Sequence, residues 1–86
     1  MNWNHRVVRT VDEETLELTL TLSEVFYVKG KPYSHGEPFL VGETLGELAE
    51  IVDRLRAALE QPVLAYPADF DFSEDPDDDD TPVAPV

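Results

Sequence analysis

The sequence contains no cysteine, only six lysine and arginine residues, and no long apolar run. Without cysteine the chain has neither disulfides nor a thiolate metal site, so its fold depends on core packing or on a partner subunit. The lack of an apolar run of about 18 residues argues against a membrane-spanning helix. Residues 1–6 are polar and do not resemble a signal peptide. We therefore expect a cytoplasmic protein that does not enter a membrane.

Acidic residues outnumber basic ones by nineteen to six, which gives a net charge of −13. Residues 1–68 hold eleven acids and six bases, whereas residues 69–86 hold eight acids and no base. Nucleic acids and anionic lipids both require cationic contacts, so neither is an expected direct ligand. A chain of this charge is attracted to basic surfaces. The alternative interpretation is that the charge only keeps a small protein soluble.

The groups that catalysis requires are scarce in this sequence. The two histidines, His5 and His35, lie in no recognised catalytic motif, and Ser34 beside His35 does not define a triad, which depends on geometry. Four scattered glycines do not form a phosphate-binding loop. The aspartates at 77–80 lack the shaped loop that a calcium site needs. We therefore expect no enzyme, no cofactor and no specific metal site.

Two segments of alternating apolar and polar residues predict the first strands. Residues 3–11 alternate and are rich in β-branched side chains. Residues 15–28 form the clearest predicted strand, because a two-residue period over this length indicates a half-buried strand. Its apolar face carries Leu16, Leu18, Leu20 and Leu22. The alternation breaks near Ser23 and Glu24, which favours a bulge there or a stretch covered on both faces.

A turn at residues 29–32 leads into a predicted return strand at residues 33–41. Gly30 tolerates a positive φ and Pro32 cannot donate to a strand ladder, so both favour a turn. Residues 39–41 are the firmest part of the return strand. A last short apolar run at residues 63–66 predicts an edge strand or an extended segment that covers the end of the helix.

One amphipathic helix is predicted between the return strand and this edge strand. Thr44 and Glu47 match a capping box, and Pro62 ends the helix. Apolar residues recur every three or four positions and form one stripe, which predicts a helix face packed against the sheet. The stripe consists of Leu45, Leu48, Ile51, Val52, Leu55 and Leu59.

These elements predict an α+β fold of the order βββαβ. A small antiparallel sheet of three to four strands would be covered on one face by the amphipathic helix. The folded domain is expected to span residues 1–67. Residues 68–86 are expected to form a disordered acidic tail, because their composition cannot bury enough apolar surface to offset the entropy of ordering.

Three segments carry a resemblance to a group of small uncharacterised bacterial proteins. They are Trp3-Asn4-His5-Arg6-Val7, Ser23-Glu24-Val25-Phe26-Tyr27 and the helix end Ala58-Leu59-Glu60-Gln61-Pro62-Val63-Leu64. Separately, the segment at residues 41–48 is similar to the sheet-to-helix join of HicB-like antitoxins. The tail resembles the acidic C-terminal tip of bacterial single-stranded-DNA-binding proteins, which implies docking of interleaved Phe and Asp on a basic, apolar groove.

The function that we predict is binding, without catalysis, to a basic protein surface. The partner could be a nucleic-acid-binding protein that the chain inhibits by mimicking nucleic acid, as anti-defence (anti-CRISPR-like) inhibitors do. The alternative is a HicB-like antitoxin or regulatory domain. A homodimer is a further prediction, because a small sheet needs its edge covered. The expected partner-binding residues are Tyr27, Tyr33, Asp69, Phe70, Asp71, Phe72, Asp77, Asp78, Asp79 and Asp80.

Overall fold

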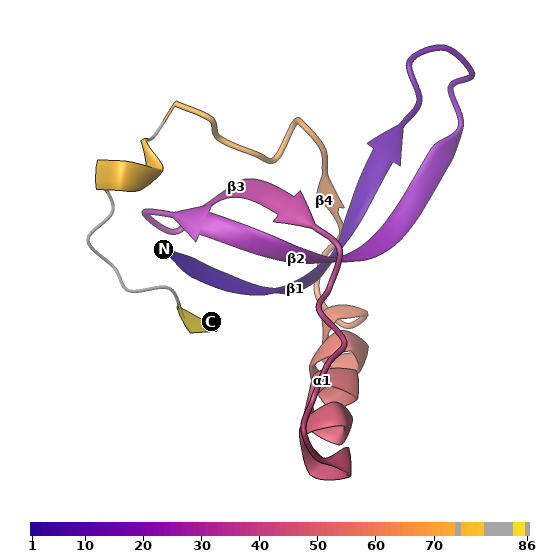
Figure 1. Ribbon diagram of the computed structural model, residues 1–86. Helices are drawn as coiled ribbons and strands as arrows, with labels where there is room; N and C mark the ends of the chain where they lie inside the picture. The colour runs from indigo at the N-terminus through magenta and orange to yellow at the C-terminus, as the bar shows by residue number, and fades with distance from the viewer. Residues whose placement is uncertain (74, 79–83, 86) are drawn as a thin grey trace.

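Two long antiparallel strands, β1 (Asn2–Val11) and β2 (Leu18–Val28), form the centre of the fold (Figure 1). The computed structural model describes residues 1–73, 75–78 and 84–85. Strand β3 (Lys31–Gly36) pairs antiparallel with β2, and β4 (Leu64–Ala65) pairs parallel with β1. The strand order β3-β2-β1-β4 and one helix confirm the α+β prediction. The sheet is mixed, however, so the expectation of a purely antiparallel sheet is corrected.

Two short elements near the end of the described chain complete this arrangement. A 3-10 turn, η1, spans Pro76–Asp78. Strand β5 (Ala84–Pro85) pairs parallel with the first residues of β1. The prediction of disorder for residues 68–86 includes residues 74, 79–83 and 86, which lie outside the described part of the chain.

The β2–β3 connection is a two-residue turn formed by Lys29 and Gly30. Both residues have positive φ, 50° and 81° respectively. Two consecutive positive φ values match the right-handed twist of the flanking strands, which is why glycine is favoured in such turns. The register of β2 with β3 shifts between Phe26 and Tyr27, where Tyr33 of β3 is the extra residue. The pairing of β2 with β1 continues without a shift through residues 23–24, so the bulge expected there does not form.

Helix α1 (Leu45–Ala58) begins as the capping box predicts. The Thr44 hydroxyl accepts a hydrogen bond of 3.1 Å from the amide of Glu47. The Glu47 carboxylate accepts a hydrogen bond of 2.6 Å from the amide of Glu43, one residue before the cap. Residues 37–43, which precede the helix, form no strand, so the strand predicted to reach residue 41 ends at Gly36.

The helix projects from the sheet instead of covering it (Figure 1). Ala58, in the last turn, is the only buried residue of α1, and its contacts with the sheet are made to β1. The radius of gyration is 13.9 Å, against about 12 Å for a compact chain of this length. The prediction that the apolar stripe of the helix packs on the sheet is therefore wrong.

The segment after β4 covers the sheet face that the helix leaves open. Phe70 is 7% exposed and packs with Val8 and Val25, both fully buried. Around it, the rings of His35, Tyr66 and Phe70 lie with centroids 4.7 to 5.5 Å apart. The packed part of the chain therefore extends past residue 67, where the sequence analysis ended the folded domain.

Candidate interaction surfaces

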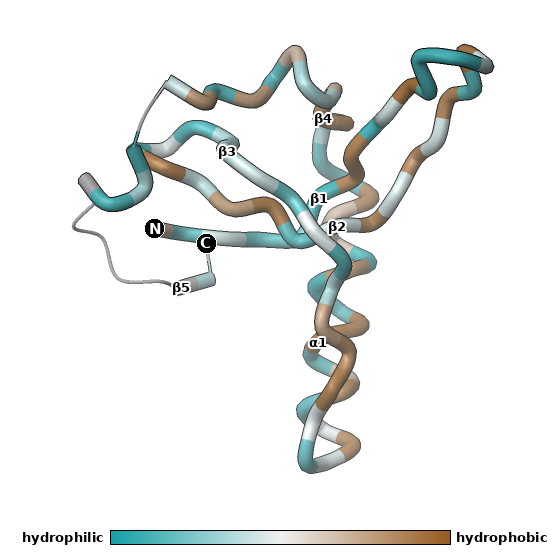
Figure 2. Tube along the Cα trace, turned by 45° about the horizontal axis from the view of Figure 1, so that its top comes forward, coloured by the Kyte–Doolittle hydropathy of each residue, from teal (hydrophilic) through white to brown (hydrophobic). Residues whose placement is uncertain are grey.

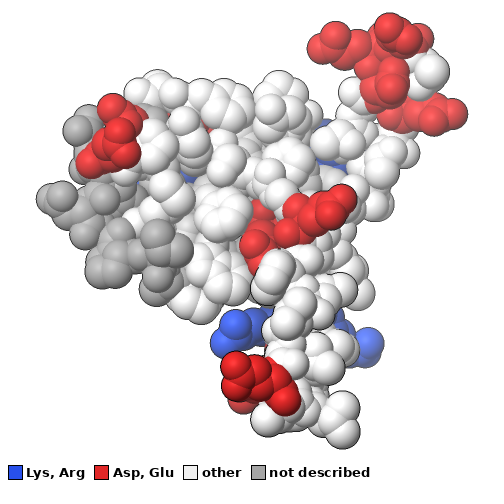
Figure 3. Space-filling view, in the orientation of Figure 1, with Lys and Arg blue, Asp and Glu red and all other residues white. Residues whose placement is uncertain are grey.

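The outer end of the β1–β2 hairpin is an acidic loop that extends away from the rest of the protein (Figure 1). The Asp12 carboxylate accepts hydrogen bonds of 2.8 and 3.0 Å from the amides of Glu14 and Thr15, which fixes the loop. These backbone donors hold the pKa of Asp12 below its usual range. Four acids and no base lie in residues 10–20, and Figure 3 shows acidic side chains gathered at this end.

Apolar side chains are exposed on the same hairpin, next to the acidic loop. Val11 pairs with Leu18 across the strands, and the two are 49% and 58% exposed. Leu20 is 58% exposed and Leu16, at φ 62°, is 75% exposed. The leucine face that the sequence predicts as core is therefore open to solvent over its first three leucines. We name residues 11–20 the hairpin end.

The second exposed apolar surface lies on α1 and on the connection that leads into it. We name residues 39–59 the arm. Figure 2 shows the connection running beside the helix, with brown, hydrophobic stretches on both. The most exposed apolar side chains of the arm are Phe39 at 72%, Val41 at 64%, Leu45 at 85%, Val52 at 60% and Leu59 at 61%. Exposed apolar patches of this kind indicate an interaction site.

The two tyrosines expected to anchor a partner are engaged within the fold. Tyr27 is half-buried against the core cluster, and its hydroxyl donates a 2.8 Å hydrogen bond to Asn4. The Tyr33 ring lies edge-on to Phe72, 6.0 Å between centroids. Neither side chain stands free on the surface, so they are weaker partner-binding candidates than the sequence indicates.

The predicted tail residues divide between packed and exposed positions. Phe70 is buried, whereas Phe72 is 54% exposed. The Asp69 carboxylate accepts a 2.7 Å hydrogen bond from the amide of Ala65, and Asp71 forms a 3.4 Å ion pair with Lys31. Hydrogen bonds from Ser73, followed by Lys31, lower the pKa of Asp71.

The four consecutive aspartates at the end of the predicted site are only partly described. Asp77 is exposed, and Asp78 is placed by its backbone in η1. Asp79 and Asp80 lie outside the described residues. Only Asp77 and Asp78 of this run can therefore be placed in the fold.

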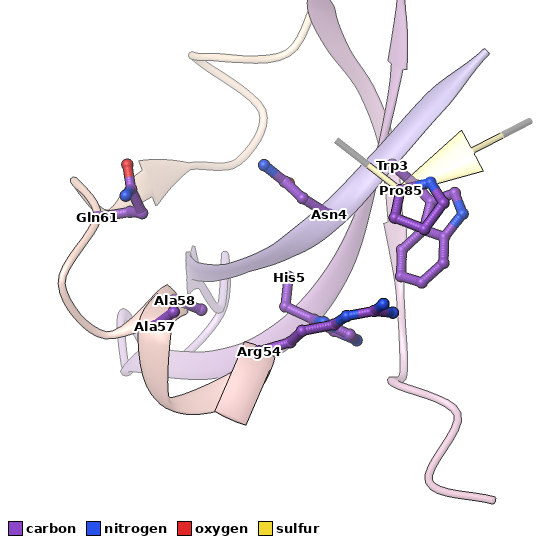
Figure 4. Close-up of a pocket in the computed structure, with 8 residues that line it drawn as sticks. All are labelled: Trp3, Asn4, His5, Arg54, Ala57, Ala58, Gln61 and Pro85. Carbon is purple, nitrogen blue, oxygen red and sulfur yellow. The ribbon is translucent and has the colours of Figure 1, made fainter. Parts of the chain in front are cut away.

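A pocket of about 280 Å³ lies where the end of α1 meets β1 (Figure 4). Its lining includes Trp3 and His5 from β1 and Arg54 from α1. His5 is buried, and its Nε2 finds no hydrogen-bond partner among the described residues. Burial lowers the pKa of His5, although Glu24, 3.9 Å away, opposes this shift. The volume is below the roughly 300–1,000 Å³ typical of small-molecule sites.

Metal-binding clusters and membrane-spanning helices do not occur in the part of the chain that the structure describes. No three His, Asp or Glu side chains of residues 1–73, 75–78 and 84–85 gather as a metal site would require. No helix in these same ranges has the length and apolar character needed to cross a membrane.

The chain matches no family model, no curated protein and no solved structure. The resemblances drawn from residues 3–7, 23–27, 41–48 and 58–64 therefore stay predictions. For the HicB-like join, the structure adds that residues 41–43 form no strand before α1.

Proposed function

We propose that this chain is a non-catalytic interaction protein of the cytoplasm whose hairpin end binds a basic, partly apolar surface on a partner protein. The observation that carries the proposal is the pairing of acidic and apolar side chains on one projecting ribbon. Glu13, Glu14 and Glu17 lie beside the exposed leucines 16, 18 and 20.

Each of these two chemical features has a distinct role in binding. The acids raise the association rate with a basic surface through long-range attraction, which salt weakens. The leucines stabilise the complex because their burial removes apolar surface from water, which contributes about 25 cal/mol per Å². Charge alone would not select a partner, so the apolar side chains and the shape of the ribbon supply selectivity.

A protein surface that normally holds nucleic acid fits this chemistry. Such surfaces present lysine and arginine to phosphates and often carry aromatic platforms for bases. The acids of the hairpin end would occupy the phosphate positions, and its leucines would contact the apolar platforms. The proposed consequence is inhibition of the partner by nucleic-acid mimicry.

The proposal is tested by capture from a bacterial lysate with two variants of equal charge. The first carries Glu13→Gln, Glu14→Gln and Glu17→Gln at the hairpin end. The control carries Glu37→Gln, Glu60→Gln and Asp75→Asn, all exposed and outside both the hairpin end and the arm. Both have a net charge of −10, since three acids are removed from −13.

We expect the wild type and the control to capture the same basic proteins at low salt. Duplex DNA or RNA should displace them, and the hairpin-end variant should lose them. Equal capture by both variants would show that binding depends on net charge and not on the acids of the hairpin end. Captured proteins that are acidic, or that stay bound at high salt, would contradict the proposal.

A further inference from the structure

Exposed apolar side chains recur at regular intervals along the helix of the arm. Leu45, Leu48, Val52, Leu55 and Leu59 follow one another at intervals of three, four, three and four residues. This is the a/d spacing of a coiled-coil seam, which packs one helix lengthwise against another. Ala58 meets β1 in the last turn, whereas Leu45 and Val52 are 85% and 60% exposed.

We infer that the arm is a homodimer interface, in which α1 packs antiparallel against α1 of a second copy about a twofold axis near Val52. A twofold interface needs a self-complementary surface, because the same patch is used by both chains. A helix with one continuous apolar seam meets this requirement.

The size of the exposed surface agrees with a dimer. Seven large apolar residues of the arm are at least one-third exposed. They present apolar area on the order of several hundred Å², near the about 800 Å² per partner of a standard interface. Monomeric proteins rarely leave a contiguous patch of this size uncovered. The connection, with Phe39 and Val41, would widen the helix–helix contact.

The charges of the arm favour the antiparallel orientation. Before Val52, which lies near the proposed axis, the arm contains Glu43, Glu47 and Glu50 and no base, whereas after Val52 it contains Arg54 and Arg56 with Asp53. Parallel helices would place three acids beside three acids. Antiparallel helices place them beside the arginines, and they also oppose the two helix dipoles favourably. Packed helices lie about 8–10 Å apart, which is close to one Debye length at physiological salt. The attraction between the acids of one helix and the arginines of the other is therefore not fully screened.

The acidic hairpin end does not obstruct this pairing. The hairpin end projects in a different direction from the arm, as the red side chains at the far end of Figure 3 show. This inference is independent of the proposed function, because it uses residues 39–59 and not residues 11–20.

The first test is the molecular mass of the full chain by sedimentation equilibrium across a hundredfold dilution. One chain has a mass of 9.7 kDa. We expect a reversible shift between one and two chains for the wild type. Val52→Glu should be a single chain throughout, with unchanged circular dichroism, because Val52 is exposed within one chain. Val11→Glu, at a similarly exposed site on the hairpin end, should dimerise as the wild type does.

The second test fixes the orientation and uses the absence of cysteine from the chain. Val52→Cys lies near the proposed axis and should form an interchain disulfide under mild oxidation. Leu45→Cys is seven residues away, so its copy in the other chain lies about 21 Å distant and should not crosslink. A mixture of Leu45→Cys and Leu59→Cys should form the mixed disulfide.

Three outcomes would overturn the inference. A single-chain mass for the wild type at all concentrations would exclude the dimer. Loss of dimerisation in Val11→Glu, but not in Val52→Glu, would place the interface on the hairpin end. Rapid crosslinking of Leu45→Cys to itself would show parallel helices. None of these results affects the proposal that residues 11–20 bind a partner protein, which the capture experiment tests separately.

Discussion

The ring of Phe70 lies against the ring of Tyr66, with 5.2 Å between centroids and 70° between planes. This edge-to-face contact holds the segment after β4 on the sheet, over Val8 and Val25. Acidic residues surround Phe70 in the sequence, yet it is a core residue.

Phe70→Ala should therefore lower the free energy of unfolding by about 3–5 kcal/mol, as expected for a buried phenylalanine. Phe72→Ala is the matched control. Because Phe72 is 54% exposed, this substitution should lower the free energy of unfolding by much less. Urea unfolding followed by circular dichroism measures both. Equal, small losses would show that residues 69–72 detach without consequence for the core.

The same packing predicts where the chain can be shortened. A chain that ends at residue 73 should unfold cooperatively with nearly the wild-type midpoint, because it keeps Phe70 and Asp71. A chain that ends at residue 68 should lose stability comparable to that lost by Phe70→Ala. Full stability of the shorter chain would restore residue 67 as the end of the folded domain.

The start of α1 depends on the Thr44 side chain, which caps the amide of Glu47. Thr44→Ala should lower helix stability by about 1 kcal/mol, whereas Thr44→Ser keeps the hydroxyl and should restore most of it. Hydrogen exchange of the first-turn amides measures the effect locally. Unchanged exchange in Thr44→Ala would show that the cap does not stabilise the projecting helix.

The buried His5 predicts a loss of stability as the pH falls. Its pKa in the folded chain lies below the 6.5 of an unperturbed histidine, chiefly because of burial. Between these two values the unfolded chain binds more protons, so stability decreases as pH decreases through that window. Glu24 raises the pKa of His5 and so limits this shift, whereas Arg54 lowers the pKa further.

His5→Gln removes this titration and should flatten the pH dependence of the urea midpoint between pH 7.5 and 5.5 relative to the wild type. The other acids titrate in both proteins, so the difference in slope isolates His5. Parallel slopes would show that protonation of His5 costs no stability.

The sequence predicts local structure well and the packing partners poorly. The capping box at Thr44, the alternation in β2 and the turn at Gly30 all depend on neighbouring residues, and all three elements form. Period and composition show only that one face of an element is apolar. They do not show what covers that face.

Two predictions are wrong for this reason. The stripe of α1 predicts packing on the sheet, yet Leu45 and Val52 are exposed in the single chain. The aspartates beside Phe70 predict a disordered tail, yet Phe70 is buried. One buried aromatic ring over Val8 and Val25 outweighs that local composition, and only the three-dimensional contacts show it.

The exposed stripe changes the expected effect of arm substitutions on one chain. Leu45→Ala should alter the unfolding free energy of the monomer by no more than about 0.5 kcal/mol, as for other surface sites. The same change should weaken dimerisation. Melting at low and high protein concentration separates the two effects. A large loss in dilute protein would mean that Leu45 belongs to the core of a single chain.

The apolar stripe of α1, we infer, is covered by a second copy of the chain and not by its own sheet. Amide hydrogen exchange, measured at low and at high protein concentration, tests this most directly. We expect the amides of residues 45–58 to exchange more slowly as the protein concentration rises, while those of residues 11–20 do not change. Exchange in α1 that is independent of concentration, with a constant single-chain mass, would contradict it.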